Sequence, residues 1–257
     1  MSRAFIFDID GTLTPSRLRM LPEFEEFFKD WASNHNFFLV TGSDIVKTKE
    51  QVPVNILGMA QAIYCCCGNV HYYPSSFHSQ PTLELGPVFF EKRFSMEFNP
   101  PQDLLDYLES ELESSSYPKR CGNHIELRQG MVNFSIVGRD CNLEERKDFY
   151  EWDKKFTKRD RIAAHITKKW KNLDASLGGQ ISVDIYPKGK DKSQVLNKII
   201  KSIRADEYIF IADKTYPGGN DYPLAAIMQD KDNCTVKHVD SWEDTLEYLK
   251  NPPIIIS

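Results

Sequence analysis

Two acidic residues near the start of the chain have a spacing that suggests chemistry. Asp8 and Asp10 directly follow the apolar run AFIF, and Gly11 and Thr12 come next. A carboxylate that ends a buried strand costs free energy unless it is hydrogen-bonded, paired or bound to a cation. Carboxylates in such a place can ligate a metal, attack an electrophile or transfer a proton. A turn at Gly11 would aim the two side chains at different atoms of one ligand.

Two more polar segments follow apolar runs further along the chain. Residues Thr41–Asp44 (TGSD) follow FFLV, and residues 213–221 (DKTYPGGND) follow YIFIA. These runs are continuous rather than alternating, which is typical of parallel strands buried on both faces. Open parallel sheets bind ligands outside the carboxyl ends of their strands. We therefore expect the three polar segments to meet at one edge of a sheet.

Convergence of these segments would bring together the carboxylates of Asp8, Asp10, Asp213 and Asp221. Such a group repels itself unless a cation neutralises it, and oxygen ligands beside a phosphate favour Mg²⁺. Thr41, Gly42 and Ser43, at the start of a helix, can hold a phosphate with their hydroxyl and amide groups. Taken alone, TGSD is also typical of a helix N-cap at Ser43 or Asp44, and GGND of a turn.

The elements that must position these segments alternate between strand and helix. AFIF, FFLV, AIYCCC and YIFIA are expected strands, whereas PEFEEFFKDWASNH and SQVLNKIIKSIRA carry apolar residues at helical spacing. This alternation predicts an α/β fold with an open, parallel sheet.

The middle of the chain, from about residue 83 to residue 186, has a different pattern. A helix-like segment, PQDLLDYLESELES, precedes the alternating runs NHIELRQ and MVNFSIVGR, a long charged helical stretch and the strand QISVDIYP. Hairpins with helices indicate an α+β insertion with a half-exposed sheet. We expect a core domain of residues 1–82 and 187–257 that a second domain, residues 83–186, interrupts. The final NPPIIIS is expected to be a short tail.

Composition excludes some classes of function. The 257 residues are 41% hydrophobic and have a formal charge of −5, so they can bury a large core but have no general attraction for nucleic acid or an anionic membrane. The first residues lack the pattern of a secretory signal, and no run approaches the roughly 20 apolar residues of a membrane span, so we expect a cytoplasmic protein. The basic stretch from Lys154 to Lys171 is interrupted by acids and is expected to be a solvated helix.

Six cysteines are present, and three of them form the run Cys65-Cys66-Cys67. This run lacks the Cys-x-x-Cys spacing of metal sites, so we expect reduced, buried thiols, with a zinc site as the alternative.

As a set, the polar segments resemble the signature of the haloacid dehalogenase superfamily. That signature is Asp-x-Asp-Gly-Thr, then a Thr or Ser after the next strand, then a Lys, then a late acidic pair. The matching residues here are Asp8-Ile9-Asp10-Gly11-Thr12, Thr41, Lys192, and Asp213 with Asp221. Lys188 and Lys190 are close enough to Lys192 to be alternatives to it. The resemblance implies a Rossmann-like core that is interrupted by a cap domain of the C2 type.

A closer resemblance, to the eukaryotic-type phosphomannomutases, rests on four segments. They are FDIDGTLTPSR, HIELRQGMVNFSIVGRDCNLEERKDFYEWDKK, GGQISVDIYPKGKDK and ADKTYPGGNDY. The similarity is dense from about Cys121 to Tyr222 and weaker between Val54 and Lys119 and after Tyr222. It implies an isomerase that interconverts mannose 6-phosphate and mannose 1-phosphate, with a hexose 1,6-bisphosphate as the intermediate.

The resemblance also implies a role for each matched residue. Asp8 is the nucleophile that becomes an aspartyl-phosphate, Asp10 is the acid/base, and Lys192 neutralises the charge around Asp8. The metal ligands implied are Asp8, Asp10 through its backbone carbonyl, Asp213, and Asp221 nearby with Asn220 in support. The expected substrate ligands are Arg17, Arg128, Arg139, Arg146, Ser182 and Asp184, of which the arginines suit phosphate oxygens and the last two suit sugar hydroxyls.

Further expectations follow from the family. We expect Mg²⁺ and a bisphosphorylated hexose activator, a hexose phosphate substrate, a homodimer through the cap, and a place in the mannose metabolism that leads to GDP-mannose. The chain departs from the family's usual pattern where it has TGSD, CCCGN and Ala212-Asp213-Lys214. Two alternatives therefore stay open, namely a sugar-phosphate phosphatase of the same fold and a non-catalytic binding protein.

Overall fold

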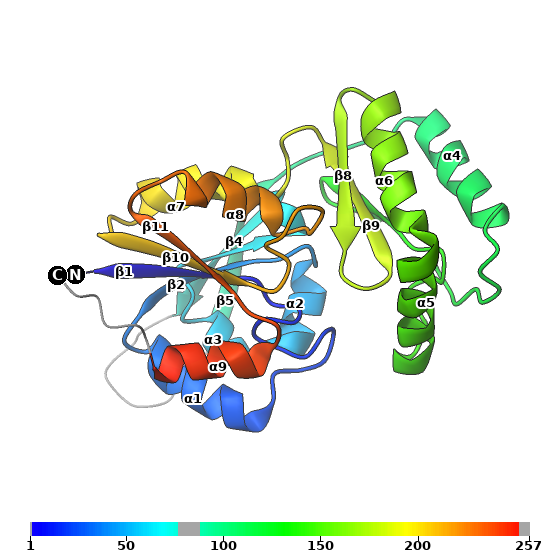
Figure 1. Ribbon diagram of the computed structural model, residues 1–257. Coiled ribbons are helices and arrows are strands. Elements are labelled where there is room, and N and C mark those ends of the chain that lie inside the picture. Colours follow the sequence, from blue (N-terminus) through cyan, green and yellow to red (C-terminus); the bar gives the residue numbers. More distant parts are fainter. Residues whose placement is uncertain (1, 77–87, 252–257) are drawn as a thin grey trace.

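The computed structural model describes residues 2–76 and 88–251, which form two domains that each surround a sheet of their own (Figure 1). The larger sheet has strands in the order β11-β10-β1-β2-β3-β4-β5, and the smaller has the order β6-β7-β9-β8. We call these domains the core and the cap. Helices that cover a largely parallel sheet confirm the α/β class that the sequence predicts.

The core strands are β1 (Arg3–Phe7), β2 (Asn36–Val40), β3 (Ala62–Cys65), β4 (Val70–Ser76), β5 (Val88–Ser95), β10 (Glu207–Ala212) and β11 (Cys234–His238). The core helices are α1 (Pro22–Ala32), α2 (Ile45–Gln51), α3 (Val54–Leu57), α7 (Leu196–Ser202), α8 (Tyr222–Gln229) and α9 (Trp242–Lys250), with 3₁₀ turns η1 (Cys66–Gly68) and η2 (Lys192–Val195). The strands from β11 to β3 are parallel, so the loops after β1, β2 and β10 leave the sheet at one edge.

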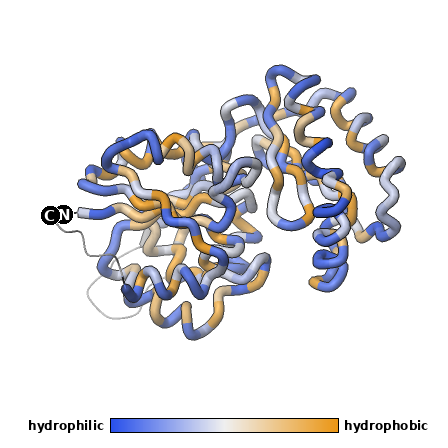
Figure 2. The backbone as a smooth tube through the Cα atoms, in the orientation of Figure 1, coloured by the Kyte–Doolittle hydropathy of each residue, from blue (hydrophilic) through white to orange (hydrophobic). Residues whose placement is uncertain are grey.

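Alternation along β1 explains why the core sheet is covered on both faces. Phe5 and Phe7 pack in the apolar cluster beneath α1 and α9, whereas Ala4 and Ile6 pack in the cluster beneath α7 and α8. Figure 1 shows these helix pairs on opposite sides of the sheet, and Figure 2 shows the hydrophobic strands between them. Because helices block both faces, the ends of the strands are the place where a ligand can reach this sheet.

The division between the two sheets differs from the boundary that we expected at residue 83. Strands β4 and β5 pair antiparallel with each other, and β4 pairs with β3, so the hairpin extends the core sheet. Residues 88–95 therefore belong to the core, and the cap sheet begins at β6. A hairpin carries no local signal for the sheet that it joins, because that choice depends on the pairing of β4 with β3. Residues 83–87 lie outside the described residues.

The cap strands are β6 (Ile125–Arg128), β7 (Met131–Phe134), β8 (Leu173–Gly178) and β9 (Ser182–Pro187), and they pair antiparallel. Helices α4 (Gln102–Glu113), α5 (Leu143–Phe156) and α6 (Lys158–Lys169) cover one face of this sheet (Figure 1). The charged stretch that we expected to be helical is thus two helices. Thr157 separates them, with a left-handed backbone of φ 48°.

The two faces of the cap sheet differ in character. Val183 and Ile185 on β9 pack under the cap helices in an apolar cluster. Ser182 and Asp184, the alternate positions of the strand, point to the opposite face. Tyr186 shares that face and packs in the apolar cluster of the core, so this face is directed at the core. Strand alternation therefore aims the polar side chains of the cap at the core domain.

None of the helices within residues 2–76 and 88–251 has both the length and the apolar character that crossing a membrane requires. The predicted tail, residues 251–257, lies outside the described residues except for Asn251.

Candidate active site

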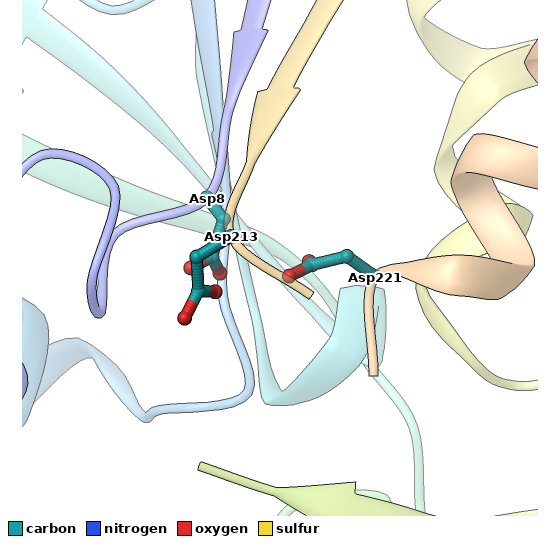
Figure 3. A group of neighbouring side chains, drawn as sticks. All are labelled: Asp8, Asp213 and Asp221. Carbon is teal, nitrogen blue, oxygen red and sulfur yellow. The ribbon is translucent and has the colours of Figure 1, made fainter. Parts of the chain in front are cut away.

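Three carboxylates meet at the edge of the core sheet where β1 and β10 end. Asp8 follows β1, Asp213 follows β10, and Asp221 directly precedes α8 (Figure 3). One carboxylate oxygen from each residue lies within 4.8 Å of those of the other two. Because β1 and β10 are neighbouring parallel strands, their last residues place Asp8 beside Asp213. The first and the last polar segments of the sequence therefore converge.

Lys192 forms ion pairs with two of these carboxylates. Its ammonium donates to Asp8 Oδ1 at 2.5 Å and to Asp221 Oδ1 at 2.6 Å, and its side chain is fully buried. Burial lowers the pKa of Lys192, but Asp221 and Asp8 outweigh burial and hold this pKa well above its ordinary value. Lys188 is exposed and Lys190 is half-buried, and neither contacts a carboxylate of this cluster.

The positive charge of Lys192 does not neutralise the three carboxylates. Burial, and next the charge of Asp221, raises the pKa of Asp8 well above its ordinary value, against the opposing effect of Lys192. A second ammonium, that of Lys214, contacts Asp213. With two ammonium groups for three carboxylates, the cluster retains one negative charge, and the ionised form of Asp8 is held at a cost in free energy.

A divalent cation with a preference for oxygen ligands fits this arrangement. The donor atoms are carboxylate oxygens that lie close together, and they carry more negative than positive charge. Gly11 leaves the room that the cluster needs, since a Cβ at this position would lie 2.6 Å from Asp213 Oδ2. Asp8, Asp213 and Asp221 are thus suited to hold Mg²⁺.

Asp10 is held apart from the other three carboxylates. Its Oδ1 accepts hydrogen bonds from the backbone amide of Arg17 at 2.7 Å and from Gln51 Nε2 at 2.9 Å. Arg17 reaches this position with a left-handed backbone of φ 63°. Asp10 still lines the same pocket as Asp8. The two carboxylates of the first motif therefore have different partners, as the expected turn at Gly11 implies.

The loop after β2 is ordered by side-chain bonds within itself and by backbone bonds to Tyr64, Cys66 and Cys67. Thr41 Oγ1 accepts the backbone amide of Ser43 at 3.0 Å, and Asp44 Oδ1 accepts that of Lys47 at 2.8 Å. Asp44 is thus the N-cap of α2, one of the two residues that suit this place in the sequence. The amide of Ser43 is already used, although Thr41, Gly42 and Ser43 all line the pocket.

Arg128 connects the cap with this core loop. Its Nη1 donates to the backbone oxygen of Gly42 at 3.0 Å, and its Nε donates to Glu126 Oε2 at 2.7 Å. Burial lowers the pKa of Arg128, but the carboxylates of Asp184 and Glu126 outweigh burial and raise this pKa overall. Each of the three guanidinium nitrogens thus contacts a protein group, and the bond to Gly42 links the cap with the core.

Two other arginines of the cap retain unused donors. Arg139 Nη1 donates to Ser182 Oγ at 2.7 Å, but the Nε atoms of Arg139 and Arg146 have no hydrogen-bond acceptor among the described residues. Burial, and next the nearby charges of Arg17 and Arg128, lowers the pKa of Arg139 to about 10. A cluster of buried, mutually repelling guanidinium groups with unused donors favours the binding of an anion.

One pocket joins the carboxylates of the core to the arginines of the cap. Every predicted site residue lines it except Lys192 and Asp221, and these two are buried next to Asp8 through the ion pairs of Lys192. The sequence prediction missed Asn133, whose Nδ2 donates to Asp184 Oδ1 at 2.5 Å, as well as Lys214. A single polar residue within the apolar run MVNFSIV and a lysine adjacent to Asp213 were the available signals.

The cysteines have no comparable setting. Cys65, Cys66, Cys67 and Cys141 are buried, and no cysteine within the described part of the chain belongs to a group that could hold a metal ion. Burial raises the pKa of Cys66 to about 12, which keeps this thiol protonated. All six cysteines are free of disulfides, and the expected burial is found at these four positions, whereas Cys121 and Cys234 are half-buried.

Relatives match this chain over most of its length. Residues 24–253 match the family described as eukaryotic phosphomannomutase. The chain is 32% identical over 251 residues to a probable phosphomannomutase of Caenorhabditis elegans, with 96% of this chain and 93% of the relative covered. It is 34% identical over 249 residues to phosphomannomutase 1 of Homo sapiens, with 94% and 88% covered. The chain belongs to the eukaryotic phosphomannomutase family.

Solved structures of similar shape agree with this family's expected fold. An IMP-bound, N-terminally truncated IMP-nucleotidase of Plasmodium falciparum matches with a TM-score of 0.63 and 15% identity, over 97% of this chain and 67% of that one. A haloacid dehalogenase-like hydrolase from Bacteroides thetaiotaomicron matches with a TM-score of 0.53 and 13% identity, over 97% and 99%. At these identities the likeness concerns the fold alone, and it supports the predicted Rossmann-like core.

Proposed function

We propose that this member of the phosphomannomutase family interconverts mannose 6-phosphate and mannose 1-phosphate by phosphoryl transfer through Asp8. One observation carries the proposal, namely that a single pocket has carboxylates and Lys192 at its core end and arginines at its cap end. A mutase must hold one phosphate while it transfers another, so it needs two distinct sites for anions. A pocket with one cation-seeking end and one anion-seeking end meets that need.

The core end supplies the groups for the transfer. Asp8, Asp213 and Asp221 would hold Mg²⁺, which would neutralise charge on the phosphoryl oxygens. An oxygen of Asp8 attacks phosphorus, the bond from phosphorus to the sugar oxygen breaks, and an aspartyl-phosphate forms. Lys192, bonded to Asp8 Oδ1 at 2.5 Å, fixes the orientation of this carboxylate and offsets part of the charge around it.

Asp10 is placed to move the proton. Its Oδ1 is held by the Arg17 amide and by Gln51, while Oδ2 receives no hydrogen bond from a described residue. The proton of Asp10 goes to the sugar oxygen as the phosphorus bond breaks. In the return step, Asp10 takes the proton from the sugar hydroxyl that attacks the aspartyl-phosphate. That attack forms the hexose 1,6-bisphosphate, which must turn over so that its other phosphate faces Asp8 before Asp8 attacks again.

The cap end would bind the phosphate that is not being transferred. Arg139 and Arg146 line the pocket and have unused Nε donors, and Arg17 lines it from the core. Ser182 and Asp184 line the same pocket and are the proposed contacts of the sugar hydroxyls. The pocket has a volume of about 50 Å³, well below the roughly 300 Å³ of a small ligand site, so the cap must open for substrate to enter.

A coupled assay tests the proposal. Mannose 1-phosphate is supplied with Mg²⁺ and a catalytic amount of hexose 1,6-bisphosphate, and both mannose 6-phosphate and free phosphate are measured over time. We expect mannose 6-phosphate to form with little free phosphate, because closure of the cap protects the aspartyl-phosphate from water. Release of phosphate without formation of the isomer would instead establish the sugar-phosphate phosphatase, and no turnover of either kind would favour a binding protein.

Three further parts of the proposal come from the family rather than from the site. They are a homodimer that meets through the cap, a cytoplasmic location, and supply of mannose 1-phosphate for GDP-mannose. Light scattering during size-exclusion chromatography tests the first of these, since a monomeric mass at micromolar concentration would rule the dimer out.

A further inference from the structure

Glu126 is a carboxylate within the arginine cluster of the cap, and the proposed reaction gives it no role. It lies on β6 two residues before Arg128, so both side chains point to the face of the sheet that is directed at the core. Its partner in register across the ladder is Asn133, which is in turn opposite Asp184. The strand pairing thus fixes Glu126 at the same face as the predicted sugar and phosphate ligands.

The contacts of Glu126 occupy the edge of a guanidinium that a phosphate would use. Its Oε2 accepts from Arg128 Nε at 2.7 Å and also contacts Arg128 Nη2. The same oxygen lies 3.6 Å from Arg139 Nε, which has no hydrogen-bond acceptor among the described residues. Carboxylates and phosphates bind this forked edge in the same side-on manner. A phosphate at Arg128 and Arg139 must therefore compete with Glu126.

Solvent exposure distinguishes Glu126 from Asp184, the other carboxylate that faces the arginine cluster. The Asp184 oxygens are enclosed, because Asn133 donates to one of them and a Cβ on Gly178 would lie 2.6 Å from the other. Glu126 has a longer side chain that is 34% exposed, so it can swing away without leaving a buried cavity. Three guanidinium groups act on the Glu126 carboxylate, those of Arg128, Arg139 and Arg17.

We infer that Glu126 is a displaceable counter-ion that occupies the phosphate-binding edge of Arg128 and Arg139 until a substrate phosphate replaces it. The residue lowers the affinity of the cap end for phosphate and speeds the release that a mutase needs, since the bisphosphate must let go of the cap before the sugar can turn over. This inference rests on the proposed function, because it takes the cap arginines as the ligands of the second phosphate.

Glu126→Gln tests the inference, because glutamine keeps one acceptor for Arg128 while it removes the negative charge. Binding of inorganic phosphate and of mannose 6-phosphate is measured by titration calorimetry with EDTA present, so that no metal contributes. We expect Glu126→Gln to bind both anions roughly three- to tenfold more tightly than the unaltered chain, as expected when one competing charge is removed. In steady-state assays with Mg²⁺, KM falls and kcat does not rise.

Two controls keep the outcome decisive. Glu151→Gln removes the same charge from an exposed site on α5 that pairs with Lys154, and it should leave phosphate binding unchanged. Glu126→Ala removes the acceptor as well as the charge, and thermal unfolding of each variant checks that it folds. A purely structural role predicts that Glu126→Gln binds like the unaltered chain and that Glu126→Ala binds more weakly, and this result would overturn the inference alone. If the unaltered chain bound neither anion, the proposed function would fall together with the inference.

Discussion

The two ends of the pocket differ in the sign of their excess charge, because carboxylates outnumber cations at one end and guanidinium groups outnumber carboxylates at the other. At the core end, the carboxylates of Asp8, Asp213 and Asp221 share two ammonium groups, and Asp8, Asp221 and Lys192 are almost fully buried while Asp213 is half-buried. At the cap end, four arginines line the pocket with a single cap carboxylate, Asp184, and the adjacent Glu126, which contacts Arg128, is partly exposed. The core end is thus rigid and short of positive charge, whereas the cap end is adjustable and short of negative charge. A substrate that binds a cation with one phosphate and arginines with the other supplies what each end lacks.

Removal of the nucleophile should have the largest effect on this comparison. Asp8→Asn keeps the shape of the side chain but cannot form the aspartyl-phosphate, so we expect kcat to fall by about four orders of magnitude or more. Folding should be retained, because the substitution removes one of several repelling buried charges. The coupled assay and thermal unfolding measure the two quantities. Activity within tenfold of the original would show that Asp8 is not the nucleophile.

Removal of the Lys192 ammonium should have the next largest effect, and this effect is on stability. Lys192→Met leaves Asp8 and Asp221 buried without their shared partner, and we expect the free energy of unfolding to fall by about 3–5 kcal/mol. Saturating Mg²⁺ should restore part of this loss, because the cation binds the folded state alone. Urea unfolding with and without Mg²⁺ measures both effects. Lys188→Met, at an exposed position nearby, is the control and should change stability little.

The sequence predicted the core end more completely than the cap end, for a physical reason. Asp8, Thr41 and Asp213 each follow a buried parallel strand, and such strands end at one edge of a sheet, so local pattern alone is sufficient to bring them together. The cap arginines were found only through a family resemblance. Arg128 and Arg139 come together through antiparallel pairing and a loop, which no periodicity in the sequence reports.

In both domains, contacts that depend on exact packing could not be predicted from the sequence. Glu126 was missed because its function depends on which guanidinium it meets, although alternation along β6 places it beside Arg128. Strand β5 was expected in the cap, whereas it pairs with β4 in the core sheet, and this pairing has no signal in the local sequence. Sequence patterns thus predicted elements and strand ends, whereas the pairing of elements and charges required the structure.

The cap end can be weakened without disturbing the core end. Arg146→Gln removes a buried guanidinium whose Nε has no hydrogen-bond acceptor among the described residues, so the fold should tolerate it. We expect kcat/KM to fall about 10- to 100-fold through KM, because a hydrogen bond to a charged phosphate is lost. The Mg²⁺ concentration for half-maximal activity should not change. Arg161→Gln, on the exposed side of α6, is the matched control and should behave like the unaltered chain.

A result in which Arg146→Gln altered the Mg²⁺ requirement would show that the two ends are not independent. Arg146→Gln and Glu126→Gln are expected to shift phosphate affinity in opposite directions, since one removes a ligand of the anion and the other removes its competitor. Measured together, the two variants determine whether the cap end responds to charge as the geometry implies.

The smallest expected effect lies where the two ends touch. A Cβ on Gly42 would be 3.2 Å from Asp184 Oδ2, a few tenths of an ångström too close, and Asn133 holds that oxygen's carboxylate in place. Gly42→Ala should therefore push the cap slightly away from the core loop and lengthen the hydrogen bond from Arg128 to the Gly42 carbonyl. We expect kcat/KM to fall by the equivalent of about 1 kcal/mol. In an Asp184→Ala background the crowding is absent, so the same substitution should cost nothing further. A double-mutant cycle measures this coupling. If the effects of the two substitutions were additive, the cost of Gly42→Ala would not come from its contact with Asp184.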